Sequence, residues 1–206
     1  MTLDDLCERY PRLYHMATED ALPQIERYGL LSTEAMLDLL GITGAGREEL
    51  LTKRRPKPVV LRDKKYGKFV LRDQIPMHDS ALKKCLIGLT APQWYTMLNE
   101  RVFMWASAKR VETLLSARAY RNSRHLVLTL DTAKIVLAHG ADLRLSAINS
   151  GATLYNPPMR GVHTFSPPAE FERHNGRKHV IEVTVPKSIP KIRDYIIDAA
   201  VRKAGR

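Results

Sequence analysis

The sequence predicts an α+β fold, and three observations lead to this class. The 206 residues are 44% hydrophobic and 27% charged, which is enough apolar material for one ordinary core. Four short apolar segments have the character of strands, whereas the helical segments gather early and late in the chain. We find no internal repeat or low-complexity tract. We therefore expect one domain, residues 1–206, with helices on the N-terminal side and a C-terminal helix.

The first predicted elements are a strand and two helices. Residues 12–16 (RLYHM) form the strand, and residues 19–28 form a helix that ends at Gly29. A second helix begins after Ser32, a good N-cap residue, and ends at Gly41.

A basic arm follows these helices. Residues 51–72 hold nine basic side chains and one acidic side chain, whereas residues 1–50 hold four and ten. Pro56, Pro58 and Gly67 interrupt the arm, so we expect a loop or a hairpin rather than a basic helix.

The second half of the chain alternates strands and helices around one long loop. Thr90 and Gln93 form a capping box that opens a helix through about Glu100. Asn, Gly and Pro are frequent over residues 146–169, which we expect to be a long loop. The remaining predicted elements are strands at 101–106, 125–131 and 179–186 and helices at 109–119, 132–138 and 191–206.

Several classes of protein are disfavoured by what the sequence lacks. Two cysteines, Cys7 and Cys85, make neither a disulfide framework nor a four-thiolate zinc site, and the seven histidines are too scattered to suggest a metal. The phosphate-binding, dinucleotide-binding, zinc-protease and nucleophile-elbow motifs are absent. No apolar run is long enough for a membrane span, and the N-terminus is acidic, unlike a secretory signal. We expect a cytoplasmic protein with no metal and no membrane partner.

Two polar residues within apolar strands are candidates for chemistry. In residues 179–186, Glu182 shares a strand face with Val180, opposite the face of Ile181 and Val183. Glu182 therefore faces away from the core, into either solvent or a cleft. His15 lies at the end of the first strand, where it is either a structural histidine or a ligand-binding one.

Three segments, taken in order, resemble a known family. They are Tyr14-His15 running into a helix and YGLLS (28–32), then VFMWAS (102–107), then IEVTVP (181–186) followed by Ile189-Pro190. This order resembles the ADP-ribosyltransferase superfamily, whose split β-sheet holds NAD in a cleft. YHMATEDALPQIERYGLLS is especially similar to the opening of the DarT-like toxins, which ADP-ribosylate DNA bases.

The resemblance implies roles for particular residues. Glu182 would be catalytic and His15 would bind the NAD ribose. An aromatic residue on the middle strand would flank the nicotinamide, although this chain has Phe103 and Trp105 where many members have tyrosine. The NAD-binding set is then His15, Thr18, Phe103, Trp105 and Ser107. Arg54, Arg55, Arg62 and Arg72 are all candidates for the active-site arginine, and of these we assign Arg55 to the catalytic set.

The net charge of +11 and the resemblance together favour a nucleic acid as the acceptor of ADP-ribose. The loop 148–161 would shape the cleft and contact this acceptor. The resemblance also implies a toxin or phage-defence effector, with an antitoxin or an ADP-ribosyl hydrolase as partner. The residues assigned to nucleic-acid binding are Lys53, Arg54, Lys57, Arg62, Arg72 and Arg160.

Two other functions are compatible with parts of the sequence. Residues 19–43 could form a helix-turn-helix in a non-catalytic nucleic-acid-binding module, but the second helix carries Glu34 and Asp38 and no Lys or Arg. An RNA 2′-phosphotransferase shares the fold and uses NAD. It relies on basic residues rather than a late-strand glutamate, so Glu182 speaks against it.

Overall fold

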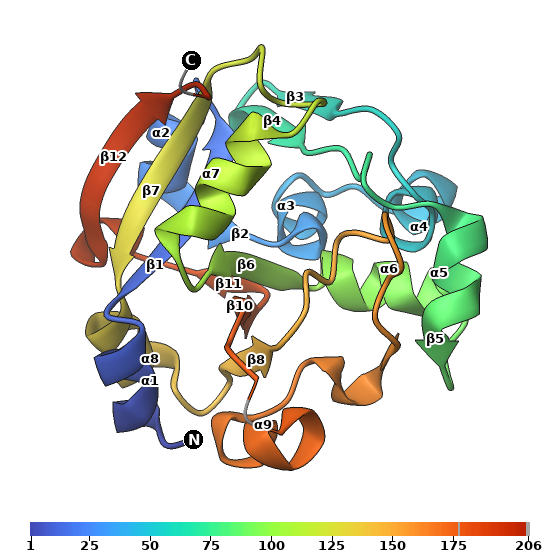
Figure 1. Ribbon diagram of the computed structural model, residues 1–206. Helices are drawn as coiled ribbons and strands as arrows, with labels where there is room; N and C mark the ends of the chain where they lie inside the picture. The colour runs from blue at the N-terminus through green and yellow to red at the C-terminus, as the bar shows by residue number, and fades with distance from the viewer. Residues whose placement is uncertain (177, 205–206) are drawn as a thin grey trace.

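A six-stranded antiparallel sheet forms the centre of the computed structural model, which describes residues 1–176 and 178–204 (Figure 1). An α+β architecture is thereby confirmed. The strands lie in the order β12 (Ile196–Arg202), β7 (His125–Asp131), β1 (Arg12–Thr18), β6 (Arg101–Trp105), β10 (Glu182–Pro186) and β8 (Arg144–Ser146).

The sheet is split between β1 and β6. β1 pairs with β7 along its whole length, from Arg12 opposite Asp131 to Thr18 opposite His125. With β6, in contrast, β1 shares the single register pair Tyr14–Trp105. The two three-stranded halves therefore meet at one point and leave a gap beside it.

Three further strand pairs and nine helices surround this sheet in the described residues. The pairs are β2 (Leu30–Leu31) with β11 (Ser188–Ile189), β3 (Val59–Asp63) with β4 (Gly67–Leu71), and β5 (Leu86–Ile87) with β9 (Arg160–Gly161). The helices are α1 (Leu3–Arg9), α2 (Leu22–Tyr28), α3 (Thr33–Leu39), α4 (Gly44–Thr52), α5 (Asp79–Cys85), α6 (Ala91–Asn99), α7 (Ala108–Ser116), α8 (Thr132–His139) and α9 (Pro168–Asn175), with 3₁₀ turns at Val162–Thr164 and Ile192–Asp194.

Both faces of the sheet are covered by helices. One face forms the largest core, to which α1, α2, α8 and α9 contribute apolar side chains. Over the other face, α7 packs Val111 and Leu115 against Met16 and Val127, and α6 builds a separate cluster around Trp94. Polar residues that face away from the main core are therefore enclosed rather than exposed to solvent.

Two segments of the family resemblance meet in space. β2 follows Gly29 and pairs with β11, so Leu30 lies opposite Ile189. Gly29 has φ +84°, and a Cβ there would lie 2.4 Å from the Ile189 carbonyl oxygen. This close approach requires glycine, and it brings YGLLS against Ile189-Pro190.

The predicted C-terminal helix over 191–206 is wrong. The described part of this segment is a 3₁₀ turn followed by β12, which pairs with the outer edge of β7. Ala199 and Ala200 favour a helix, but Ile196, Ile197 and Val201 suit a strand, and the open edge of β7 supplies the hydrogen-bond partners.

Other boundaries and elements also differ from the prediction. The strand expected at 179–186 begins at Glu182, and the helix expected from residue 19 begins at Leu22. The long loop expected over 146–169 contains β9, a 3₁₀ turn and the start of α9. The helices α1, α4, α5 and α9 were not predicted, whereas the capping box of α6 and the hairpin form of the basic arm are confirmed.

Candidate functional site

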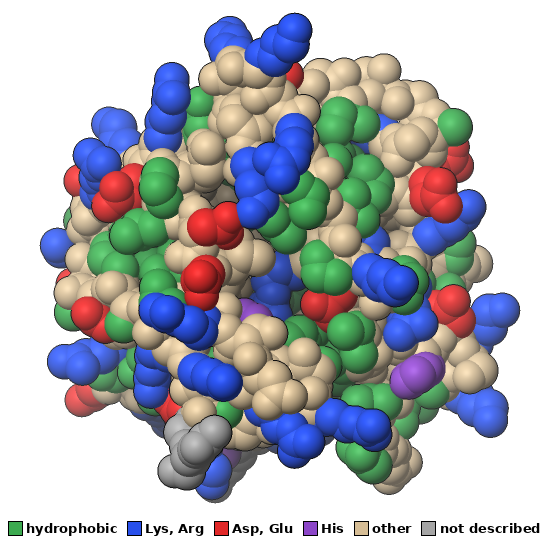
Figure 2. All heavy atoms as spheres, turned by 90° about the horizontal axis from the view of Figure 1, so that it is seen from above, with side chains coloured by type: hydrophobic (Ala, Val, Ile, Leu, Met, Phe, Trp, Pro, Cys, Tyr) green, Lys and Arg blue, Asp and Glu red, His purple; other side chains and the backbone are tan. Residues whose placement is uncertain are grey.

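A pocket of about 430 Å³ opens beside the split, where β1, β6 and β10 approach one another. β4, α2 and the loop after β8 complete its walls. Seen from above, the molecule is hollowed near its centre, and acidic, basic and histidine side chains gather there (Figure 2). Its size lies within the range usual for small-molecule and cofactor sites.

The pocket brings together seven residues that the sequence assigned to function. They come from the first, middle and last of the segments that carry the family resemblance, and from the basic arm. The seven are His15, Thr18, Arg55, Arg72, Phe103, Trp105 and Glu182. The other assigned residues, Lys53, Arg54, Lys57, Arg62, Ser107 and Arg160, do not line it.

Glu182 is the central acidic residue of this pocket. In the sheet it lies opposite Trp105 on β6, which in turn lies opposite Tyr14 on β1, so the three form a row across the split. Glu182 is only 3% exposed, which excludes the solvent-facing interpretation and leaves the cleft. One carboxylate oxygen, Oε1, accepts a hydrogen bond of 3.1 Å from the backbone N–H of Ser150. The other, Oε2, is buried and has no partner among the described residues.

The ionisation of Glu182 is strongly affected by this environment. Burial raises the pKa of its carboxyl to about 7, against the opposing effects of Ser150 and of the positive charges on Arg160 and Arg110. A carboxyl with a pKa near neutrality can both carry charge and exchange a proton under physiological conditions.

His15 lies where the backbone pairing between β1 and β6 ends. Its Nδ1 lies 2.8 Å from the carbonyl oxygen of Phe103, so the imidazole serves as a partner for β6 beyond the last backbone pair. Burial lowers the pKa of His15 to about 4, and the ring is therefore neutral at pH 7. Because a carbonyl can only accept, Nδ1 carries the proton and Nε2 is left as a hydrogen-bond acceptor.

Two aromatic side chains from β6 line the same pocket. Phe103 and Trp105 alternate with the core residues Val102 and Met104, and so face the side of the sheet that Glu182 faces. Phe103 packs edge to face against Phe165, with ring centroids 5.8 Å apart. These rings give the pocket an apolar wall that suits a planar ligand.

Arg55 lines the pocket but most of its hydrogen-bonding capacity is used inside the protein. Its guanidinium donates to the backbone oxygens of Leu50 and Arg72 and to Asn99 Oδ1, at 2.8 to 3.1 Å. Burial lowers its pKa to about 10, which leaves it charged at pH 7. The geometry thus makes Arg55 a fixed positive charge that ties the basic arm to α4 and α6.

Arg72 occupies a different part of the pocket wall. Its guanidinium lies 5.1 Å from the centre of the Tyr120 ring, and Tyr120 donates a hydrogen bond of 2.6 Å to Asp73. Arg72 therefore lies at the pocket rather than on the exposed part of the hairpin, and its assignment to nucleic-acid binding stays a prediction.

Three other assigned residues do not line the pocket. Arg160 is 1% exposed and cannot reach a nucleic acid from its buried position. Ser107 occupies the N-cap position of α7 and lies outside the pocket, while Arg54 donates to the backbone oxygens of Gln74 and Ile75.

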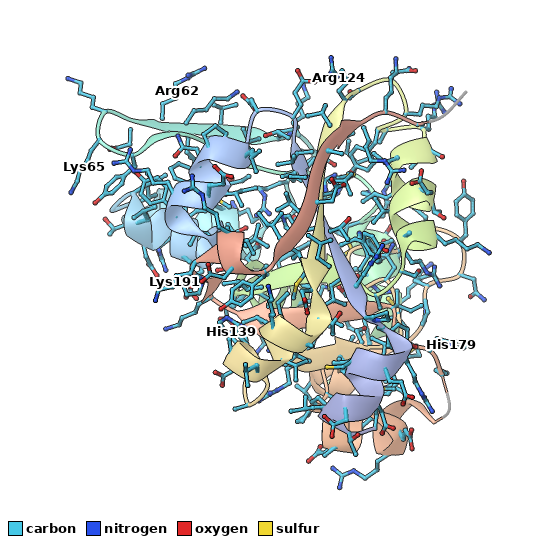
Figure 3. The ribbon with its side chains drawn as sticks, turned by 90° about the vertical axis from the view of Figure 1, so that its left-hand side faces the viewer. Arg62, Lys65, Arg124, His139, His179 and Lys191 are labelled. Carbon is cyan, nitrogen blue, oxygen red and sulfur yellow. The ribbon has the colours of Figure 1, made fainter. Side chains whose placement is uncertain are left out.

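Several basic residues of the arm and its hairpin are exposed. Arg62 and Lys65 extend away from the body of the protein at the β3–β4 hairpin (Figure 3). Lys53 and Lys57 are also exposed, at the start of the arm. These exposed side chains carry the positive charge from which the sequence predicted a phosphate-facing arm.

Two groups of functional interest were missed from the sequence. Ser150 holds Glu182 through its backbone N–H, and no side-chain pattern could reveal a backbone contact made by a loop. Asn99 accepts a hydrogen bond from Arg55 through its Oδ1. The sequence did offer a signal for Asn99, because a polar residue ends the apolar helix segment WYTMLN.

Two further findings concern other kinds of site. Across residues 1–176 and 178–204, no group of three or more His, Cys, Asp or Glu side chains is arranged to hold a metal ion. In the same part of the chain, every helix is too short or too polar to cross a bilayer.

Comparison with known families gives one result. The model of a family of unknown function, DUF7002, matches residues 11–196. The chain belongs to this family. The match extends from the start of β1 past the end of β10, so the pocket lies within the part that defines DUF7002. A search of curated proteins found no match.

Proposed function

We propose that this protein is an NAD-dependent ADP-ribosyltransferase. The observation that carries the proposal is the buried carboxylate oxygen Oε2 of Glu182, which has no partner among the described residues and lies in a pocket beside His15 and an aromatic wall. These residues come from the three segments whose order resembles the ADP-ribosyltransferase superfamily. The volume, the apolar wall and the unpartnered oxygen all fit a ligand such as NAD.

Glu182 suits the charge that develops in this chemistry. NAD supplies the bond between nicotinamide and ribose, and its cleavage builds positive charge on the ribose, as in glycoside hydrolysis. The electron pair of that bond leaves with the nicotinamide, and a nucleophilic atom of the acceptor bonds to the same ribose carbon. The charged carboxylate of Glu182 stabilises the positive charge and then takes the proton that the acceptor loses.

His15 and the β6 aromatics suit the binding of the two ends of NAD. The neutral imidazole presents Nε2 as an acceptor, which a ribose hydroxyl can satisfy as donor. Phe103 or Trp105 offers a face for the nicotinamide ring. Arg55 and Arg72 add fixed positive charge for the pyrophosphate.

We infer that the acceptor is a nucleic acid. Support comes from the exposed basic side chains of the arm, which lie on the segment that also sends Arg55 and Arg72 into the pocket. Phosphates bound along the hairpin would therefore lead a nucleic-acid chain toward the pocket mouth.

The helix-turn-helix alternative is not favoured. Its two helices, α2 and α3, are separated by the strand β2, which pairs with β11. On α3, the acidic residues Glu34 and Asp38 both pair with Arg47. A recognition helix needs donors for bases and phosphates, and the described face of α3 is acidic.

A transfer assay tests the proposal. The protein is incubated with NAD labelled in its adenylate part and with separate pools of DNA, RNA and protein. We expect label to become attached to a nucleic-acid pool with the wild-type protein and not with the Glu182→Gln variant. Label attached only to protein would correct the acceptor, and no transfer to any pool would contradict the proposed activity.

A further inference from the structure

Arg160, at the start of β9, is one of the largest fully buried side chains of the protein. Its Nη1 donates a hydrogen bond of 3.0 Å to the carbonyl oxygen of Ser150, and its Nε donates one of 3.2 Å to that of Pro158. The guanidinium also lies 5.7 Å from the centre of the Trp94 ring. Burying a charge without a carboxylate hydrogen-bonded to it is costly, so a specific use is expected.

Ser150 connects Arg160 to Glu182. The carbonyl oxygen of Ser150 accepts a hydrogen bond from Arg160, and the N–H of Ser150 donates one to Glu182 Oε1. Two backbone groups of one loop residue thus link the arginine to the carboxylate. The connection also closes the base of the loop between positions 150 and 160, whose tip residue Tyr155 is 97% exposed.

The two charged groups also act on each other. The positive charge of Arg160 lowers the pKa of Glu182, in the direction opposite to burial, and Arg110 from the start of α7 acts in the same sense. Arg160 therefore favours the charged carboxylate both through space and by holding Ser150 in place.

We propose that Arg160 is a positioning residue, which fixes the Ser150 turn against Glu182 and so keeps the carboxylate oriented and ionised. The proposal rests on the proposed function for its catalytic consequence. It replaces the assignment of Arg160 to nucleic-acid binding. It also gives the loop a role inside the protein, because Ser150 at the base of the loop donates the hydrogen bond that holds the Glu182 carboxylate.

The test compares Arg160→Met, which removes the charge and both hydrogen bonds, with Arg160→Lys, which keeps only the charge. Arg173→Met is the matched control, because Arg173 is an exposed arginine on α9 that pairs with Glu170. The pKa of Glu182 is measured by NMR titration of carboxyl-labelled glutamates, with its signal assigned by its loss in Glu182→Gln. Rates of NAD cleavage are measured across pH in parallel.

In Arg160→Met we expect a higher pKa for Glu182 and an acid limb of the pH profile moved to higher pH. At a pH well below the wild-type pKa, a tenfold weaker acidity of Glu182 lowers kcat about tenfold, because the charged fraction falls by that factor. Arg160→Lys should keep the pKa closer to that of the wild type but lower kcat, with KM little changed, because the Ser150 turn is no longer held. Arg173→Met should change none of these.

The outcomes separate this proposal from the proposed function. If the wild-type protein does not act on NAD, the proposed function fails, while the titration of Glu182 still decides whether Arg160 controls its ionisation. If Arg160→Met does not fold, the comparison rests on Arg160→Lys. An unchanged pKa of Glu182 in Arg160→Met, or a loss of activity in Arg160→Lys that follows its thermal stability alone, would overturn the positioning role.

Discussion

Folding disfavours the charged form of the Glu182 carboxyl relative to the unfolded chain. Its carboxyl is buried, one of its oxygens has no partner among the described residues, and its pKa is raised from 4.5 to about 7. The neutral form therefore stabilises the fold fully below about pH 4.5, and this contribution is lost as the pH rises through about 7. A group placed at such a cost is typical of a functional site rather than of a structural one.

Replacing Glu182 with Gln should consequently stabilise the protein at alkaline pH while abolishing NAD cleavage. Gln does not ionise, so the variant avoids the loss that the wild-type protein suffers as the pH rises from about 4.5 through about 7. We expect a rise in Tm of at least about 2–4 °C near pH 8, corresponding to about 1 kcal/mol, and a smaller difference near pH 5. Thermal unfolding at the two pH values measures this. A fall in Tm at both would mark Glu182 as a structural partner instead.

Replacing His15 with Ala should weaken NAD binding. The loss of one hydrogen bond to the ribose costs about 0.5–1.5 kcal/mol, which corresponds to a roughly 2- to 12-fold higher Kd. Calorimetry with NAD measures the change, and His179→Ala serves as a control at an exposed histidine outside the pocket (Figure 3). Equal affinities in the wild type and His15→Ala would remove His15 from the binding site.

At the residue scale, the sequence predicted those pocket residues whose positions follow from the order of the strands in the sheet. His15, Trp105 and Glu182 belong to three strands that are neighbours in the sheet, and the resemblance placed them in one cleft. Arg160 was assigned wrongly because its burial depends on contacts with Ser150 and Trp94, which no local pattern reveals.

At the element scale, the basic arm divides its charges between two environments. Arg55 and Arg72 line the pocket, and Arg54 is held by backbone oxygens. Lys57, Arg62, Lys64 and Lys65 are exposed at or beside the hairpin. None of these four side chains lines the pocket, so the hairpin presents a positively charged surface of its own.

Replacing the exposed basic residues of the hairpin should weaken acceptor binding and leave NAD binding intact. Each lost phosphate contact lowers the slope of log K against log salt by about 0.7–0.9, so four changes lower it by up to about 3.6. Nucleic-acid binding measured over a range of salt tests this. The variant carries Ser at Lys57, Arg62, Lys64 and Lys65, and the control carries Ser at Lys83, Lys84, Arg173 and Lys203. An equal loss of slope in the control would show that only the net charge matters.

The elements also show which parts of the fold local sequence signals predict and which parts they do not. Elements defined by local signals, such as the Thr90 capping box and the hairpin around Gly67, were predicted correctly. The C-terminal segment was predicted as a basic helix, and its alanines do favour a helix locally. It forms β12 because the edge of β7, far away in the sequence, provides a partner.

At the scale of the whole molecule, the site draws on nearly the full chain. The pocket is lined from His15 near the N-terminus to Glu182 near the C-terminus, and the two halves of the sheet meet between them at one register pair. The α+β class followed from composition and periodicity. A split sheet was expected only from the resemblance, since the split depends on where the pairing of β1 with β6 ends and on the imidazole of His15 beside it.

The release of nicotinamide from NAD tests the central claim most directly. Purified protein is incubated with NAD and a mixed nucleic-acid pool, and free nicotinamide is followed by chromatography over time. We predict steady release by the wild-type protein and by Arg173→Met, and none above background by Glu182→Gln, with the rate falling as the pH drops below about 7 because the carboxylate becomes protonated. Intact NAD after incubation with the folded wild-type protein, or equal release by Glu182→Gln, would contradict the account.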